Sequence, residues 1–386
     1  MEIADAVVIG GGVIGTSIAY RLAEDRNVIL IEKGEVGSGT SGACDKAIFL
    51  QSKQPGFPVR LAKASKEIYE NLQAELEEPI EFKKGGGMIV IEKEAHLDFM
   101  KEFVKKQYKA GIDVNLLDRK ETLAIQPALS ETIAGSTFST EDAEVNPLLL
   151  SQAFAAAAKR RGASIQTYTE VTGIKTQDGK ITGVQTNQGY IATELVINAA
   201  GPFASQIAEM AGVGLTIMPR RGVILISEKV EPMINGNILC SQYMASKHFT
   251  SKSEKNAPSY GIGLSLGQTE SGNLLIGGSR EFKGYDRKVE PHVLSAIAAH
   301  ACRIAPALNK IKIIRSMVGF RPYTGDGLPI IDWAREVDGF VVAAGHEGDG
   351  IALAPITGKL VTGLVNNDSK SSDLLEPLKM DRLQVV

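Results

Sequence analysis

The N-terminal end of the chain shows the clearest pattern of apolar and polar positions. Residues 5–9 ("DAVVI") form a short apolar run rich in β-branched side chains, which predicts a buried parallel strand. Residues 13–25 ("VIGTSIAYRLAED") carry apolar side chains at helical intervals, and residues 27–32 ("NVILIE") form a second apolar run. The pattern therefore predicts a strand, a helix and a second parallel strand, which together make one βαβ unit.

Later segments add further strands and a second kind of sheet. Residues 169–205 predict a β-meander that returns as the apolar strand "LVINAAG", and residues 338–365 predict a strand, a glycine-rich turn and an amphipathic helix. Residues 217–317 supply several strands followed by one long helix. Strands followed by a helix are typical of an antiparallel sheet that is covered on one face.

These elements predict an α/β fold of the mixed α+β kind with two domains. A chain of 386 residues, of which 44% are hydrophobic, is long enough for two cores of ordinary size. One domain is expected to be Rossmann-like, and the other to be built on the antiparallel sheet. We assign residues 1–80, 143–216 and 318–386 to the first domain, and residues 81–142 and 217–317 to the second.

Composition and charge exclude several classes of protein. A net charge of −3 gives no electrostatic reason to expect nucleic acid or an anionic membrane as a partner. Lys359 interrupts the best apolar stretch before it reaches the roughly 20 residues that a membrane span needs. Cys44, Cys240 and Cys302 contain no CxxC pair, and the histidines lack the spacing of metal ligands. We therefore expect a cytoplasmic protein without a membrane span or a metal site.

The candidate chemistry begins with the glycines between the first strand and the first helix. Gly10, Gly12 and Gly15 have the GxGxxG spacing, which allows a tight turn, a close approach to a pyrophosphate and close packing of helix on strand. The helix N-terminus offers free N–H groups to phosphates. Glu32 follows at the distance typical of a carboxylate that binds a ribose, and its charge argues against NADP. The motif predicts a dinucleotide site without separating NAD from FAD; the alternative is a glycine-rich turn in an ordinary α/β protein.

Six motifs, in this order and spacing, resemble one flavoprotein family. They are the GxGxxG turn, "GSGTSG" (37–42), "EVNP" (144–147), "NAAG" (198–201), "GFRPYTGDGLPIID" (319–332) and "GHEGDGIALAP" (345–355). The family includes D-amino acid oxidase, glycine oxidase, sarcosine oxidase, and the β subunits of heteromeric sarcosine oxidase and proline dehydrogenase. The resemblance implies non-covalently bound FAD in the first domain and a substrate-binding second domain. Since the chain has only one GxGxxG turn, electrons are expected to enter from the substrate.

The resemblance also implies which residues bind FAD. They come from the glycine turn, the second strand end, the "GSGTSG" loop, the meander, the "NAAG" strand end and the C-terminal turn. In sequence order they are Gly10, Gly12, Val13, Ile14, Gly15, Glu32, Lys33, Gly39, Thr40, Ser41, Val171, Ala200, Gly201, Gly348, Asp349, Gly350 and Ile351. A helix that starts at the C-terminal turn would stabilise the negative charge of reduced flavin.

The resemblance implies that Arg321 binds a substrate carboxylate, because a guanidinium can donate hydrogen bonds to both carboxylate oxygens. The alternative is an arginine that ties two loops together through a surface ion pair. Glycine oxidase-like sequences have a second arginine where this chain has Gly348, between Glu347 and Asp349. Carboxylate binding then depends on Arg321 alone or with other residues, such as Tyr260 or Tyr323. Alternatively, the substrate has a positive group near the two acids.

Two further residues leave alternatives open. His346 could take a proton from the substrate amine, or it could hold its loop in place. Cys44 could attach to a flavin, or it could be a small apolar filler.

The sequence thus predicts FAD-dependent oxidation of an amino acid or secondary amine of the glycine, sarcosine, proline, D-amino acid or opine type. Hydride would pass from the C–N carbon to flavin N5 and leave an imine. The alternative is a β-type subunit of a heteromeric opine oxidase, proline dehydrogenase or hydrogen cyanide synthase-like complex, because "CDKAIFLQSK" (44–53) resembles such subunits. Oxygen, a quinone or a partner subunit would accept the electrons, in a homo- or hetero-oligomer. An RNA-modifying enzyme and a non-catalytic flavin-binding scaffold are the remaining alternatives.

Overall fold

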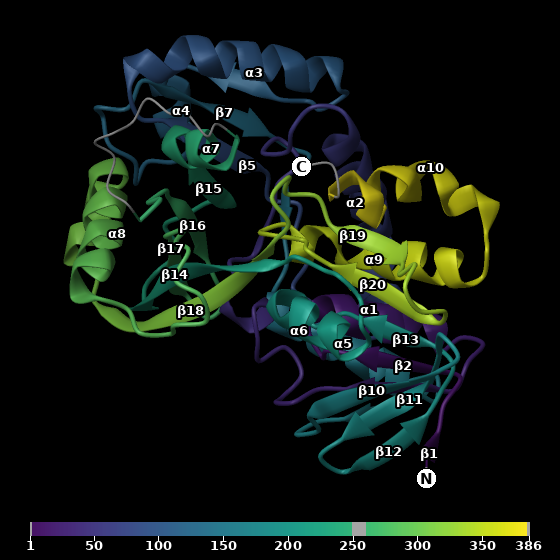
Figure 1. Cartoon of the computed structure of the whole chain (residues 1–386). Coiled ribbons are helices and arrows are strands. Elements are labelled where there is room, and N and C mark those ends of the chain that lie inside the picture. Colours follow the sequence, from purple (N-terminus) through teal and green to yellow (C-terminus); the bar gives the residue numbers. More distant parts are fainter. Residues whose placement is uncertain (1, 249–259, 384–386) are drawn as a thin grey trace.

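The computed structural model describes residues 2–248 and 260–383 (Figure 1). A six-stranded sheet forms the centre of one half of the molecule, in the order β19-β20-β13-β2-β3-β9. Its strands are β2 (Ala6–Ile9), β3 (Val28–Ile31), β9 (Ser164–Gln166), β13 (Val196–Asn198), β19 (Ile330–Trp333) and β20 (Phe340–Ala344). All neighbours are parallel except β19 and β20. The predicted βαβ unit is confirmed, because β2 and β3 flank a helix and pair in parallel.

Both faces of this sheet are covered, which explains its continuous apolar runs. On one face Ala6 and Val8 pack with the helices α1 (Val13–Leu22), α2 (Phe57–Leu76), α5 (Pro147–Arg160) and α9 (Gly350–Val365). On the other face Val7 and Ile9 pack with α6 (Ala204–Met210) and a small four-stranded sheet. The strands of that small sheet are β1 (Glu2–Ile3), β10 (Val171–Gln177), β11 (Lys180–Thr186) and β12 (Gly189–Ala192).

An eight-stranded sheet forms the other half, in the order β18-β14-β17-β16-β15-β5-β7-β6. Its strands are β5 (Gly87–Ile91), β6 (Asn115–Leu117), β7 (Gly135–Ser139), β14 (Met218–Lys229), β15 (Asn237–Cys240), β16 (Ser265–Gln268), β17 (Asn273–Gly277) and β18 (Ile313–Tyr323). The predicted combination of a Rossmann-like part with a second, antiparallel sheet is confirmed. One detail differs, because β15 and β5 pair in parallel.

Helices cover much of the eight-stranded sheet. Helix α8 (Pro291–Ile304) packs on β14 and β17, and α3 (Leu97–Lys109), at the top of Figure 1, contacts β6. The remaining elements are α4 (Arg119–Ile125), α7 (Ser241–His248), α10 (Ser372–Leu375) and the pair β4 (Ala47–Ile48) and β8 (Ala143–Glu144). Along β14, Val223 and Leu225 face the α8 side, whereas Gly222 and Ile224 face a cavity between the two halves.

The two large sheets use different segments of the chain. The division into residues 1–80, 143–216 and 318–386 against 81–142 and 217–317 stays a prediction, and β18 crosses its boundary at residue 318. Over its full length β18 pairs with β14, from Met218 opposite Tyr323 to Ser227 opposite Ile313. A single long ladder therefore runs from the outer edge of the eight-stranded sheet to the interface between the halves.

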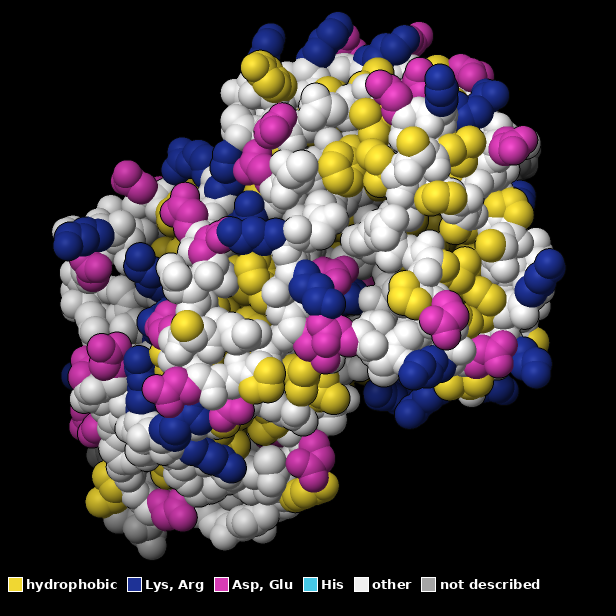
Figure 2. All heavy atoms as spheres, turned by 180° about the vertical axis from the view of Figure 1, so that it is seen from behind, with side chains coloured by type: hydrophobic (Ala, Val, Ile, Leu, Met, Phe, Trp, Pro, Cys, Tyr) yellow, Lys and Arg dark blue, Asp and Glu magenta, His cyan; other side chains and the backbone are white. Residues whose placement is uncertain are grey.

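The surface gives no sign of a single-sign charged face on the side shown in Figure 2, where acidic and basic side chains are interspersed. Among the described helices, none combines the length and the hydropathy that crossing a bilayer requires.

Candidate active site

A cavity of about 590 Å³ lies between the two halves of the molecule. The ends of β2, β3, β13 and β20 open into it through Ile9, Ile31, Ala199 and Ala344. These are the carboxyl ends of parallel strands, which is where ligands bind in open α/β sheets. The opposite wall comes from β14 and β18 of the eight-stranded sheet.

The glycine turn fits closely against the neighbouring strand. Gly10 has a φ of +113°, and a side chain there would place Cβ 2.5 Å from the carbonyl oxygen of Ala199. A Cβ at Gly15 would lie 1.9 Å from the carbonyl oxygen of Gly10. Helix α1 therefore starts directly against the strand, and its first turn, whose N–H groups have no partner within the helix, lines the cavity at Val13 and Ile14.

Glu32 is held in place by two backbone N–H groups. Its Oε2 accepts a hydrogen bond from Gly11 N at 2.7 Å, and its Oε1 accepts one from Gly34 N at 2.8 Å. A carboxylate offers about four lone-pair positions, so both oxygens can still accept from a ligand. The carboxylate lines the cavity near the start of α1, where a ribose next to a helix-bound phosphate would lie.

The "GSGTSG" loop connects the glycine turn to the opposite wall. Ser41 Oγ accepts a hydrogen bond from Val13 N at 3.0 Å, and Thr40 Oγ1 donates one to the carbonyl oxygen of Phe320 at 2.6 Å. Small side chains keep this stretch close to the cavity. Two separate parts of the wall are thereby fixed relative to each other.

Arg321 lies on β18 with its side chain on the cavity side. Its Nη1 donates to the carbonyl oxygen of Ser279 at 3.1 Å, and a Cβ on Gly222 would lie 2.3 Å from that same nitrogen. Burial and the nearby charge of Arg280 lower the pKa of Arg321. Within residues 2–248 and 260–383, no carboxylate forms an ion pair with it. The alternative of a surface ion pair between two loops therefore does not describe this arginine.

The turn at residues 345–350 brings acids and cations together. Glu347 forms an ion pair with Arg220, and its φ of +48° is unusual for a residue with a side chain. Asp349 Oδ1 lies 2.6 Å from Lys53 Nζ. Because each acid already faces a basic side chain, the turn offers little unbalanced negative charge to a positive group of a substrate.

His346 and Cys44 both line the cavity. His346 Nε2 lies 2.9 Å from Thr357 Oγ1 on α9, and burial lowers the pKa of His346 from 6.5 to about 3. Burial also raises the pKa of the Cys44 thiol. Near neutral pH the imidazole is therefore uncharged and the thiol is protonated.

The model of the family described as FAD dependent oxidoreductase (DAO) matches residues 5–364. This chain belongs to that family. Its cofactor is accordingly FAD, and the predicted resemblance is confirmed.

Several members of the FAD-dependent oxidoreductase family are similar along nearly their whole length. Hydrogen cyanide synthase subunit HcnC of Pseudomonas aeruginosa is 28% identical, with 96% of this chain and 94% of that protein covered. Glycine oxidase of Geobacillus kaustophilus is 30% identical, with 96% and 95% covered. The crystal structure of L-proline dehydrogenase from P. horikoshii is similar with a TM-score of 0.88 and 28% identity, covering 99% of this chain and 98% of that one.

In this FAD-dependent oxidoreductase, the cavity gathers nearly all the site residues expected from the sequence. Those that line it are Gly10, Gly12, Val13, Ile14, Glu32, Lys33, Gly39, Thr40, Ser41, Val171, Ala200, Gly201, Arg321, His346, Gly348, Gly350 and Ile351. Gly15 lies behind the turn, where it allows close packing, and Asp349 lies at the start of α9 with Lys53. These residues fit FAD, because they combine a helix N-terminus, a fixed carboxylate and a second helix start at α9.

The two tyrosines suggested as helpers of Arg321 lie elsewhere. Tyr260 packs on His292 with ring centroids 5.0 Å apart, and the Tyr323 hydroxyl donates to the carbonyl oxygen of Gly325. Tyr243 lines the cavity instead. Nothing local in the sequence marks Tyr243, which lies near the start of α7, because its approach to the cavity depends on the packing of the whole sheet.

The sequence also does not predict an aromatic contact between the two halves at the edge of the cavity. Tyr285 stacks on Phe203 with ring centroids 4.8 Å apart, and Lys33 Nζ lies 3.4 Å from the centre of the Phe203 ring. Arg287 lines the cavity from the same segment. Buried Arg221 anchors this segment through Glu281 and the carbonyl oxygen of Lys288. Aromatic stacking thus connects the two halves next to the cavity.

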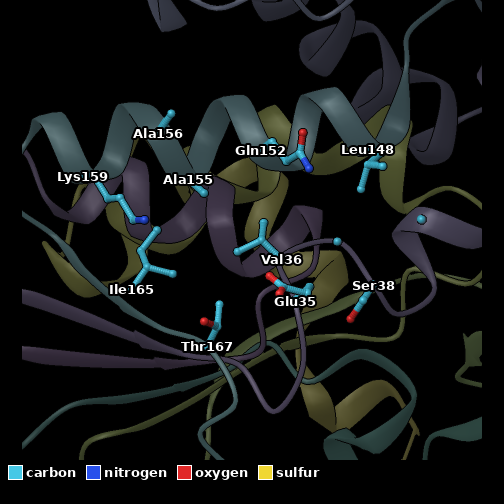
Figure 3. A pocket seen from close by; sticks show the side chains of 12 residues that line it. Glu35, Val36, Ser38, Leu148, Gln152, Ala155, Ala156, Lys159, Ile165 and Thr167 are labelled. Carbon is cyan, nitrogen blue, oxygen red and sulfur yellow. The ribbon is translucent and has the colours of Figure 1, made fainter.

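A second cavity of about 700 Å³ lies outside the "GSGTSG" loop, between α5 and β9 (Figure 3). Glu35, Gln152, Lys159 and Thr167 supply its polar groups, and Val36 and Ile165 point into it. It contains neither Arg321 nor any part of the glycine turn, and the "GSGTSG" loop, whose Ser38 lines both cavities, lies between it and the candidate active site.

A buried group of possible metal ligands lies in the second half. His300 Nε2 is 2.6 Å from Glu92 Oε1, and Cys240 Sγ accepts a hydrogen bond from Leu264 N at 3.1 Å. Cys240 and His300 are buried, and Glu92 is half-buried. No local pattern in the sequence indicates this group, because its members come from three separate parts of the chain.

Proposed function

We propose that this flavoprotein oxidises an amino acid or secondary amine whose carboxylate pairs with Arg321. The observation that carries this proposal is a half-buried guanidinium at the cavity wall that lacks a carboxylate partner among the described residues. Burying an unpaired charge is costly, and an arriving carboxylate would remove most of that cost. The guanidinium fork would also fix the orientation of the carbon next to the carboxylate.

FAD would be held by the residues that the family resemblance predicts. The first turn of α1 would bind the pyrophosphate, and Glu32 would accept hydrogen bonds from the ribose. Gly348 in the turn before α9, together with Gly350 and Ile351 at the start of the helix, would face the pyrimidine edge of the flavin. When bound, FAD supplies the acceptor for a hydride from the carbon of the C–N bond, and the substrate becomes an imine.

His346 acts in this proposal as a positioning residue. Its hydrogen bond to Thr357 ties the turn before α9 to the helix itself. Because burial lowers its pKa to about 3, it is a weak base and an uncharged one at neutral pH. A substrate amine that arrives neutral needs no proton acceptor from the protein before hydride leaves.

The direct test is anaerobic mixing of the purified protein with sarcosine, glycine, proline, D-alanine and an opine. We expect at least one of them to bleach the flavin absorbance. If no amine in the panel bleached it, the proposed reaction would be wrong. Reduction by a carboxylated amine but not by its decarboxylated analogue would support the role of Arg321.

The low pKa of His346 also predicts a pH dependence of stability. The pKa falls from 6.5 to about 3 on folding, so the unfolded chain binds more protons between these values. His346 therefore makes the free energy of unfolding decrease as the pH falls below 6.5, by about 2 kcal/mol at pH 5. Urea unfolding of the His346→Gln variant should show a shallower loss of stability between pH 7 and pH 5. An unchanged slope would contradict the burial of a neutral imidazole.

A β-type subunit of a heteromeric dehydrogenase is the second candidate. It is favoured by the similarity to a hydrogen cyanide synthase subunit over 96% of this chain. In that case the substrate-reduced protein would be reoxidised slowly by oxygen and quickly by a quinone analogue. Stopped-flow mixing with each acceptor distinguishes the two. Rapid turnover on oxygen by the isolated chain would support an oxidase instead.

A further inference from the structure

One carboxylate of the cavity wall has no basic partner in the part of the chain that the structure describes. Asp45 follows the "GSGTSG" loop, is half-buried and lines the cavity. Lys46, the next residue, forms its ion pair with Glu144 instead. Asp45 differs in this respect from Glu347 and Asp349, which both face basic side chains. It is therefore the acid in this wall that is available to a positive group of a ligand.

Two hydrogen bonds hold the Asp45 carboxylate against the eight-stranded sheet. Its Oδ2 accepts from Ser265 Oγ at 2.6 Å, and its Oδ1 accepts from Ala47 N at 3.3 Å. Ser265 lies on β16, and its neighbour Leu266 packs on the α8 side. Since successive side chains of a strand alternate, Ser265 projects to the opposite face, which Ile224 presents to the cavity. Each carboxylate oxygen retains a lone pair for a further donor.

A floor of glycine separates Asp45 from Arg321. The strand β17 runs between β14 and β16, and its Gly277 lies opposite Ser265 without a side chain. The Arg321 guanidinium lies over Gly222 on β14, where a Cβ would come within 2.3 Å of its Nη1. The backbones of β14 and β16 are two strand spacings apart, or about 10 Å. The two charged side chains thus extend over the same glycine floor from its two sides.

Electrostatic effects indicate that both charges act on the same part of the cavity. Burial raises the pKa of the Cys44 thiol, and among the nearby charges Asp45 raises it while Arg321 lowers it. Burial and the charge of Arg280 lower the pKa of Arg321, and the charge of Asp45 opposes this. A ligand that occupies the space over the floor would therefore meet a positive group and a negative group together.

We propose that Asp45 binds the ammonium group of the substrate while Arg321 binds its carboxylate. This inference rests on the proposed function and names the form in which the substrate binds, the zwitterion of an amino acid with a primary or secondary amine. An ammonium N–H and a carboxylate form a charge-assisted hydrogen bond. A short zwitterion with a hydrogen bond at each end can bridge the glycine floor. The bound ammonium must still lose a proton before the neighbouring carbon can release a hydride.

The test compares each amine with an uncharged isostere in the holoenzyme at pH 7. The pairs are sarcosine against methoxyacetate, proline against tetrahydrofuran-2-carboxylate, and glycine against glycolate. Oxygen replaces nitrogen in each pair, so the carboxylate for Arg321 is kept. Anaerobic stopped-flow bleaching at several concentrations gives the dissociation constant of the amine, and perturbation of the flavin spectrum gives that of the isostere. We expect the amine of at least one pair to bind about tenfold to a hundredfold more tightly, as a charge-assisted hydrogen bond contributes. The pair that shows the preference distinguishes a primary from a secondary amine.

Variants then assign the preference to Asp45. Asp45→Asn keeps the size of the side chain and removes its charge, so the preference for the amine should fall by about tenfold or more. The dissociation constant of the isostere should stay the same. Ser265→Ala keeps the charge but removes a hydrogen bond that orients it, and should lower the preference by a smaller factor. Asp178→Asn, in the exposed turn between β10 and β11, is the matched control and should change neither constant.

The outcomes separate this inference from the proposed function. If amines bleach the flavin but bind no more tightly than their isosteres, the inference is wrong and the proposed function stands. The inference is also wrong if the preference is the same in the wild type and in Asp45→Asn. Should Asp45→Asn fail to fold, an unchanged preference in both Ser265→Ala and Asp45→Glu would contradict the inference. If no carboxylated amine bleaches the flavin, the proposed function is wrong and the inference fails with it.

Discussion

Replacing Arg321 with methionine is expected to raise the dissociation constant of a carboxylated amine by about a hundredfold or more. The guanidinium would contribute two charge-assisted hydrogen bonds to the carboxylate, and methionine of similar length offers none. The reduction rate at saturation should also fall, because the carbon next to the carboxylate loses its fixed orientation. Titration of the flavin spectrum gives the binding term, and anaerobic stopped-flow mixing gives the rate.

Stability distinguishes a binding role for Arg321 from a structural one. A guanidinium that is partly desolvated without a carboxylate partner costs free energy in the empty protein, and this desolvation lowers the pKa of Arg321. Removing it should therefore leave the melting temperature unchanged or raise it, although the bond to the Ser279 carbonyl is lost. A marked decrease in melting temperature together with unchanged substrate binding would contradict the proposed role. Compared with Arg321→Met, the Arg321→Lys variant keeps the positive charge but cannot form the bidentate pair. It should therefore recover only part of the affinity for the carboxylated amine.

Replacing Gly15 with alanine is expected to abolish FAD binding. The new Cβ would lie 1.9 Å from the carbonyl oxygen of Gly10, and backbone atoms cannot move away as the tip of a side chain can. The start of α1 must then shift away from β2, which misplaces the N–H groups of its first turn. The variant should purify without flavin absorbance and should not recover it when FAD is added.

Gly214→Ala is the matched control for this substitution. Its Cβ would meet only the Glu336 carboxylate at 3.7 Å, and Gly214 has no positive φ. We expect normal flavin content in this variant. Full flavin content in Gly15→Ala, measured by absorbance after gel filtration, would show that the turn tolerates the shift and that the phosphate site lies elsewhere.

The first half of the fold could be predicted because its signals are local. Gly10, Gly12 and Gly15 lie within one turn, and the apolar runs on either side of α1 have the length of buried strands. The same holds for Glu32, whose distance from the turn follows from a βαβ unit of ordinary size. Each of these features depends on residues that are near one another in the chain.

The substrate end could not be predicted in the same way, because long-range pairing creates it. The ladder between β14 and β18 places Arg220 opposite Arg321, although the two are far apart in the sequence. Tyr243 lines the cavity from α7, which follows β15 in the same sheet. The acids Glu347 and Asp349 suggested a site for a positive group, since the sequence does not show that Arg220 and Lys53 lie against them. The parallel pairing of β5 with β15 is likewise a consequence of sheet assembly that no single segment indicates.

The strand order of the six-stranded sheet has a consequence for the synthesis of this protein. The strand β20, which borders β13 in the sheet, and the turn that leads to α9 leave the ribosome long after β2, α1 and β13. Until then β13 has an open edge and the wall around Gly350 does not exist. Flavin can therefore be retained only after α9 has been synthesised, and a nascent chain that stops short of α9 should be colourless and prone to degradation.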